Sequence, residues 1–185
     1  MDQTTAAEIV DRVLKGDRQS YALLIDAYKG PLFNLALRMT GSYSDADDLT
    51  QEIFIKAYRQ LNKFDQKQKY FTWLYTIGIN LIRNHLKKRT RENTYCAEDP
   101  YGVQSSDCGD KTGEGCLILE ENLIKLDANM RKLSVEVRES ILLKFFQNLT
   151  FDEVAAITGD STGAVKMRIY RGLKQLKQMM DDENI

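Results

Sequence analysis

Two blocks of apolar residues at helical spacing, separated by a segment without any such period, constrain the fold of this chain most. The apolar residues recur three and four positions apart, as on one face of a helix. They include Ile9, Val10, Val13, Leu14, Tyr21, Leu24, Ile25 and Tyr28 in the first block, and Leu133, Val137, Ile141 and Leu142 in the second. No stretch alternates with the period of two that strands require. The pattern predicts an all-α chain with two small helical domains.

The segment between the blocks has the composition of a linker. It contains four of the 11 glycines and one of the two prolines of the chain, and it lacks an apolar period. Glycine-rich polar segments are flexible because they cannot bury a hydrophobic face. We therefore predict domains at residues 1–95 and 117–185, joined by a flexible acidic linker at residues 96–116.

The charge distribution allows a nucleic-acid partner although the net charge is only −1. Residues 92–116 contain six acidic side chains and one lysine, which gives this segment a charge of −5. The rest of the chain therefore has a charge of +4, with +5 on residues 1–91 and −1 on residues 117–185. Basic domains are attracted to nucleic-acid phosphates.

Several features predict a cytoplasmic protein without membrane insertion. The first residues lack the basic and apolar regions of a signal peptide. The uncharged run from Tyr70 to Ile82 is too short to span a bilayer, which needs about 20 residues.

The sequence predicts no metal site, no cofactor and no catalytic residues. Cys96, Cys108 and Cys116 all fall in the predicted linker, at spacings that match no zinc module. We interpret them as incidental thiols, with a redox or metal switch as the alternative. The single histidine, His85, has no cysteine or carboxylate cluster at ligand spacing, so a structural role is favoured over catalysis.

A helix-turn-helix is predicted near the C-terminus. Thr150, with Glu153 three residues later, has the form of a capping box, and Gly159 can end the short helix in a left-handed conformation. A second helix is expected to start at residues 160–162. Ser134 is expected to cap the preceding helix, which runs toward Phe146.

The second helix of this motif has a face suited to duplex DNA. Lys166, Met167, Tyr170 and Arg171 fall on one side of it. Arginine and lysine donate to guanine edges and phosphates, and methionine can contact a thymine methyl group. The alternative is an amphipathic hairpin with a solvated basic face.

In the first block, a helix is expected from Asp45 to Leu61, with Ser44 and Asp47 as its capping pair. Apolar residues form a stripe on one side of this helix, which is expected to be buried, and polar residues form an arc on another side. The stripe contains Ala46, Leu49, Ile53 and Ala57, and the arc contains Asp45, Asp48, Gln51, Glu52 and Ile55. An acidic arc beside an exposed isoleucine predicts a docking surface for a basic protein partner, with a solvated helix start as the alternative.

The following helix, expected at residues 71–89, presents one continuous face that passes from aromatic residues through amides to cations. This face contains Trp73, Ile77, Asn80, Asn84, Lys87 and Arg91, with Arg83, Lys88 and Arg89 beside it. Amides read base edges, cations hold phosphates and aromatic rings stack on unpaired bases. For Trp73 and Ile77 a core role is equally compatible. The preceding loop, residues 62–70, is polar, cationic and bounded by aromatic residues.

With these motifs identified, the chain resembles the extracytoplasmic-function (group IV) sigma factors of bacterial RNA polymerase. Residues 45–54, DADDLTQEIF, resemble the segment with which that family binds the core polymerase. Residues 71–80, FTWLYTIGIN, resemble its promoter-melting segment, and the helix-turn-helix resembles its region 4. Departures from the family pattern include Asn84, Ala164 and Met167, so promoter preference is expected to differ.

The resemblance implies an alternative sigma factor, not an enzyme, with core RNA polymerase and promoter DNA as partners and an anti-sigma factor as a further one. The implied −35 contacts are Lys144, Thr162, Lys166, Met167, Arg168, Tyr170 and Arg171. The implied −10 contacts are Phe64, Trp73, Asn80, Arg83, Asn84, Lys87 and Lys88. The acidic arc would bind the polymerase, and the linker would enter its RNA channel. The alternative function is that of a stand-alone helix-turn-helix regulator.

Overall fold

The computed structural model describes residues 3–95 and 125–182. The predicted linker and its three cysteines lie outside the described residues. Every regular element within the described ranges is helical, which confirms the all-α prediction. We refer to residues 3–95 as the N-terminal half and to residues 125–182 as the C-terminal half.

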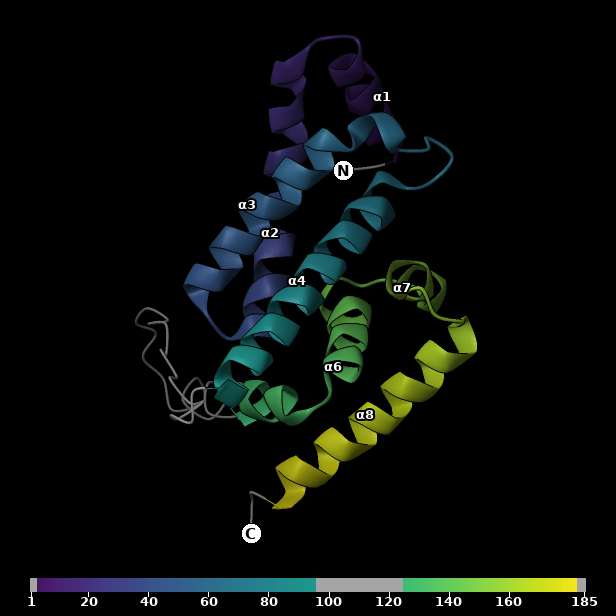
Figure 1. The fold of residues 1–185 in the computed structure, drawn as a ribbon. Helices are drawn as coiled ribbons and strands as arrows, with labels where there is room; N and C mark the ends of the chain where they lie inside the picture. The colour runs from purple at the N-terminus through teal and green to yellow at the C-terminus, as the bar shows by residue number, and fades with distance from the viewer. Residues whose placement is uncertain (1–2, 96–124, 183–185) are drawn as a thin grey trace, which may run out of the picture.

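Four helices form the N-terminal half, and α2, α3 and α4 lie alongside one another (Figure 1). They are α1 (Gln3–Leu14), α2 (Tyr21–Thr40), α3 (Tyr43–Arg59) and α4 (Tyr70–Tyr95), with short 3₁₀ turns at Arg18–Ser20 and Leu61–Lys63. The predicted stripe of α3 is buried in this half, with Ala46, Ile53 and Ala57 fully enclosed and Leu49 only 4% exposed. The 3.6-residue period therefore identified the correct inward face.

The C-terminal half begins with a helical segment at residues 125–132. One further helix follows, and then the two helices of the helix-turn-helix. These later elements are α6 (Val135–Ile141), a π-helical turn (Leu142–Phe146), α7 (Phe151–Thr158) and α8 (Thr162–Asp182). Gly172 allows α8 to pack closely on α6, because a Cβ atom at this position would overlap Cγ1 of Val137 and lie 3.0 Å from Cδ1 of Ile141. The two helices therefore meet at a position without a side chain.

Three of the four predicted capping residues are confirmed. Thr150 and Glu153 form the reciprocal capping box of α7, Gly159 ends that helix with a φ of +77°, and the Ser134 side chain caps α6. The prediction that Ser44 caps α3 is wrong, because the Ser42 side chain accepts from the Asp45 backbone N–H. The preceding helix ends at Gly41, whose φ of +73° turns the chain sharply enough for α3 to begin two residues later.

The two halves are in contact. Helix α4 packs against α7, and α2 contacts both α6 and the π-helical turn. In Figure 1, α6 and α7 lie beside α4, whereas α8 lies on the far side of α6. Helix α4 therefore packs both within its own half and against the C-terminal half.

Candidate nucleic-acid interface

Helix α8 presents the predicted duplex-reading side chains to solvent. Lys166, Met167, Tyr170 and Arg171 are all exposed, with Met167 at 53% and Tyr170 at 61%. These four residues, which we call the α8 face, therefore remain together as the sequence predicted.

The packing between α7 and α8 holds this face in place. Four apolar residues of the two helices, Val154, Ile157, Val165 and Ile169, are each at most 3% exposed. The Thr162 hydroxyl at the start of α8 donates to the Asp152 carboxylate of α7 at 2.7 Å. The turn between the helices is thus fixed by both apolar and polar contacts.

Two further predicted −35 residues have partners within the protein. Arg168 donates to the Asp160 carboxylate at 2.6 Å, and this hydrogen bond lowers the pKa of Asp160 and raises that of Arg168. Lys144 donates to the Leu149 carbonyl at 2.8 Å, with its ammonium 4.8 Å from the centre of the Phe151 ring. Like Thr162, these two side chains are engaged in holding the helix-turn-helix together.

Helix α4 carries a second polar surface, which we call the α4 face. Its predicted members Asn80, Asn84, Lys87 and Lys88 are exposed, and Trp73 is half-buried. Ile77 is only 8% exposed, so the structure assigns it to the core rather than to this surface. The amides and lysines are therefore presented to solvent at successive turns of one helix.

An aromatic cluster lies at the start of α4. Phe64 is only 8% exposed, and its ring centre lies 5.5 Å from that of Tyr70 and 5.3 Å from that of Trp73. Burial also raises the pKa of Tyr70. Phe64 therefore anchors the loop at residues 62–69 on the rings of Tyr70 and Trp73, and it is not exposed for stacking on a base.

The remaining predicted −10 cation, Arg83, is bound by the other half of the protein. Its guanidinium donates two hydrogen bonds to the Glu139 carboxylate of α6, one of them from Nε at 2.8 Å. The Glu139 side chain is fully buried and that of Arg83 is 23% exposed. Burial raises the pKa of Glu139 while the hydrogen bonds from Arg83 oppose this shift, and the same bonds raise the pKa of Arg83.

Two other polar contacts connect α4 and its preceding loop to the C-terminal half. Lys69 donates to the Glu153 carboxylate of α7 at 2.7 Å. The Tyr75 hydroxyl donates to the Gln147 side-chain oxygen at 2.9 Å, and the Gln147 amide donates to the Pro31 carbonyl of α2 at 3.2 Å. Sequence reasoning missed Glu139 and Glu153 as partners of these cations, because no local pattern connects residues 56 and 84 positions apart.

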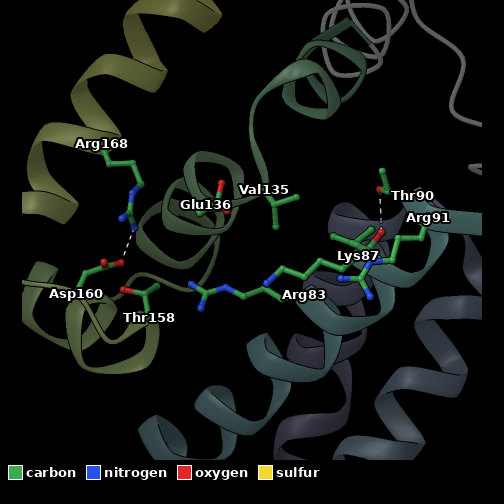
Figure 2. A pocket seen from close by; sticks show the side chains of 10 residues that line it. Arg83, Lys87, Thr90, Arg91, Val135, Glu136, Thr158, Asp160 and Arg168 are labelled. Carbon is green, nitrogen blue, oxygen red and sulfur yellow. Dashed lines mark hydrogen bonds and ion pairs between the residues drawn. The ribbon is translucent and has the colours of Figure 1, made fainter. Parts of the chain in front are cut away.

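A cavity of about 500 Å³ lies where the two halves meet. Figure 2 shows Arg83, Lys87 and Arg91 entering it from α4, opposite Thr158, Asp160 and Arg168 of the C-terminal half. Arg83 extends toward the turn that carries Thr158 and Asp160. The contact between the halves is therefore incompletely filled at this point, where most of the lining residues are charged or polar.

The acidic arc of α3 is mostly presented to solvent. Asp48, Gln51 and Glu52 are exposed, and Ile55 is 51% exposed. Asp45 differs, because its carboxylate accepts a hydrogen bond from Arg89 of α4 at 3.0 Å. We call the four outward residues the α3 face.

Other kinds of site have no support in the part of the chain that the structure describes. Residues 3–95 and 125–182 contain no group of three metal-ligating side chains. None of the helices described is long and apolar enough to cross a membrane.

Comparison with family models places two known modules on the chain. Residues 24–92 match sigma-70 region 2, and residues 123–176 match sigma-70 region 4. The first match includes α3, α4 and the loop between them, and the second includes the helix-turn-helix. The α3 and α4 faces thus fall in the first module and the α8 face in the second.

Curated relatives match along nearly the whole chain. The chain is 30% identical to the ECF RNA polymerase sigma factor SigW of Bacillus subtilis, over 94% of this chain and 95% of the relative. It is 31% identical to the ECF RNA polymerase sigma-E factor of Escherichia coli K12, over 92% of this chain and 91% of the relative.

A solved structure has the same fold. It is the sigma factor RpoE in complex with the anti-sigma factor NepR from Bartonella quintana, with a TM-score of 0.73 and 21% identity. The match covers 88% of this chain and 98% of the other. Both helical modules of this chain therefore have a structural counterpart in one known protein.

Proposed function

Since the chain belongs to the extracytoplasmic-function sigma factors, we propose that it binds core RNA polymerase through its α3 face and directs it to promoters with its α4 and α8 faces. We assign these roles because the chain has three separate exposed surfaces that differ in chemistry. One surface is acidic with an apolar edge, one combines amides and lysines, and one belongs to the second helix of a helix-turn-helix.

The α8 face supports recognition of duplex DNA at the −35 element. The second helix of a helix-turn-helix enters the major groove, where arginine, lysine and methionine contact base edges and methyl groups. Lys166, Met167, Tyr170 and Arg171 point outward together and have the required chemistry. Lys144, Thr162 and Arg168 support this role by holding α7 and α8 in position.

The α4 face supports opening and recognition of the −10 element. Asn80 and Asn84 offer donors and acceptors to exposed base edges, and Lys87 and Lys88 can neutralise phosphates. The aromatic cluster of Phe64 and Trp73 lies beside the cationic loop at residues 62–69 and is suited to positioning it. We therefore propose that the α4 face binds the separated DNA strands and that the α8 face binds duplex DNA.

The α3 face supports docking on the polymerase. Carboxylates around an exposed isoleucine are complementary to a basic protein surface. Complementary charges raise the association rate and orient the two partners. The match to sigma-70 region 2 favours this role over that of a stand-alone helix-turn-helix regulator. Since core polymerase is cytoplasmic, the proposed site of action is the cytoplasm, and an anti-sigma factor is the proposed second partner.

In vitro transcription from a genomic library tests the proposal. Core polymerase with the purified chain is expected to initiate at a discrete set of promoters that neither component uses alone. Co-elution of the chain with core polymerase during gel filtration is expected as well. The absence of both co-elution and chain-dependent transcripts would exclude the proposed function.

A further inference from the structure

The contacts between the two halves involve Arg83, one of the implied −10 contacts, and Lys69, which belongs to the cationic loop at residues 62–69. Arg83 of α4 is bound by Glu139 of α6, and Lys69 of the loop before α4 is bound by Glu153 of α7. Both acids belong to the C-terminal half and both cations to the N-terminal half. Carboxylates of one half thus bind cations of the other half.

We propose that the free chain adopts this closed arrangement and that Glu139 and Glu153 compete with promoter DNA for Arg83 and Lys69. This inference rests on the −10 role proposed above and adds a mechanism that regulates it. The guanidinium of Arg83 presents two parallel donors to Glu139, the same geometry with which arginine binds a phosphate. Arg83 cannot make both contacts at once, so the halves must separate for it to bind DNA.

The chemistry of the contact allows such a separation. A buried ion pair contributes little net stability, because both charges regain hydration when they part. The Lys69–Glu153 pair is partly exposed, with its lysine side chain 55% in solvent. The cavity of about 500 Å³ beside Arg83 shows that packing between the halves is incomplete around this ion pair.

The closed arrangement leaves the other two proposed functional faces accessible. The α3 face and the α8 face are exposed while Glu139 and Glu153 hold the two cations. The free chain can therefore engage polymerase and duplex before it engages separated strands. This implies an order of events in which strand binding by the loop and Arg83 comes last.

A charge-removing double variant tests the competition in the full-length chain. Glu139→Gln and Glu153→Gln remove both acids, and glutamine at residue 153 retains the form of the α7 capping box. The matched control is Asp181→Asn with Asp182→Asn, which removes the same charge from exposed positions at the end of α8. Circular dichroism melting of both double variants and of Glu153→Gln alone establishes that each remains folded.

Two measurements decide the outcome. Small-angle X-ray scattering should give a larger radius of gyration for the Glu139/Glu153 variant than for the wild type and the control. Fluorescence anisotropy with single-stranded oligo(dT), at one fixed low salt concentration, should show about fivefold tighter binding by that variant alone. Unchanged compactness in the folded variant would overturn the proposal, as would expansion without tighter binding.

The same experiment separates this inference from the proposed function. If the chain directs transcription with core polymerase but the variant behaves as the wild type, only the competition is wrong. If the variant expands while neither form binds DNA or supports transcription, the −10 role is wrong and the inference fails with it.

Discussion

Arg89 of α4 donates a hydrogen bond to Asp45 near the start of α3, with 3.0 Å between Nη1 and Oδ2. The Nε2 atom of His85, one turn earlier on α4, lies 3.4 Å from the same carboxylate oxygen. Asp45 therefore connects the helix proposed to bind polymerase with the helix proposed to open the promoter. Asp48 and Glu52 are exposed on the outward side of α3.

The first prediction is that Asp48 and Glu52, rather than Asp45, determine affinity for core polymerase. Asp48→Ala with Glu52→Ala should weaken core binding by about tenfold, because both carboxylates would lose a basic partner. Asp45→Asn should change core affinity by less than about twofold, since its partner is internal. Fluorescence titration of labelled protein with core polymerase measures both, with circular dichroism as the control for folding. A larger effect of Asp45→Asn than of the double variant would contradict the assignment.

The second prediction concerns recognition of duplex. Arg171→Ala should weaken binding to −35 duplex by about 1–3 kcal/mol if Arg171 contacts a base, without a change in Tm. A mobility shift assay at fixed salt measures this, with Lys174→Ala, an exposed cation further along α8, as the matched control. Equal losses in the two variants would indicate a phosphate contact without base recognition.

The third prediction concerns strand opening. Asn80→Ala with Asn84→Ala should reduce permanganate reactivity of thymines in the −10 element, because two groups proposed to bind unpaired bases are removed. Duplex affinity should remain near that of the wild type. Arg171→Ala provides the reciprocal control, since it should lower duplex affinity yet allow opening once polymerase is loaded. If both variants fail in the same assay by similar amounts, the division between the α4 and α8 faces is wrong.

The fourth prediction is that Gly172→Ala destabilises the C-terminal half. The added methyl group would overlap Val137, so α6 and α8 would have to move apart, at a cost of about 1–3 kcal/mol. Gly163→Ala, at an exposed position of the same helix with open space around it, is the control and should leave Tm unchanged or raise it. Thermal unfolding followed by circular dichroism compares the two. A Tm for Gly172→Ala equal to that of the wild type would show that the helices adjust freely.

The fifth prediction concerns pH. The hydrogen bond from Lys69 holds the pKa of Glu153 below its ordinary value of 4.5, and the capping contact with Thr150 acts in the same direction. A lowered carboxyl pKa adds stability that is present above pH 4.5 and is lost as the pH falls through the lowered value. The difference in Tm between the wild type and Glu153→Gln should therefore be constant near neutral pH and shrink below pH 4.5. A difference that grows on acidification would contradict this sign.

The sequence alone determined the helical character of the chain, several helix caps and most of the exposed faces. Such features depend on interactions over three or four residues. The Thr150–Glu153 capping box and the buried stripe from Ala46 to Ala57 are of this kind. The same local periods placed Met167 and Tyr170 on an outward face.

Only the tertiary structure decided which charged side chains on these faces are free and which are paired. Arg83 and Arg89 look alike in sequence to the exposed Lys87, yet Arg83 is bound by Glu139 and Arg89 by Asp45. The partners are 56 and 44 residues away along the chain, so no local period connects them. An ion pair depends on the distance between its charges in space, and that distance is set by how α4 packs against α3 and the C-terminal half.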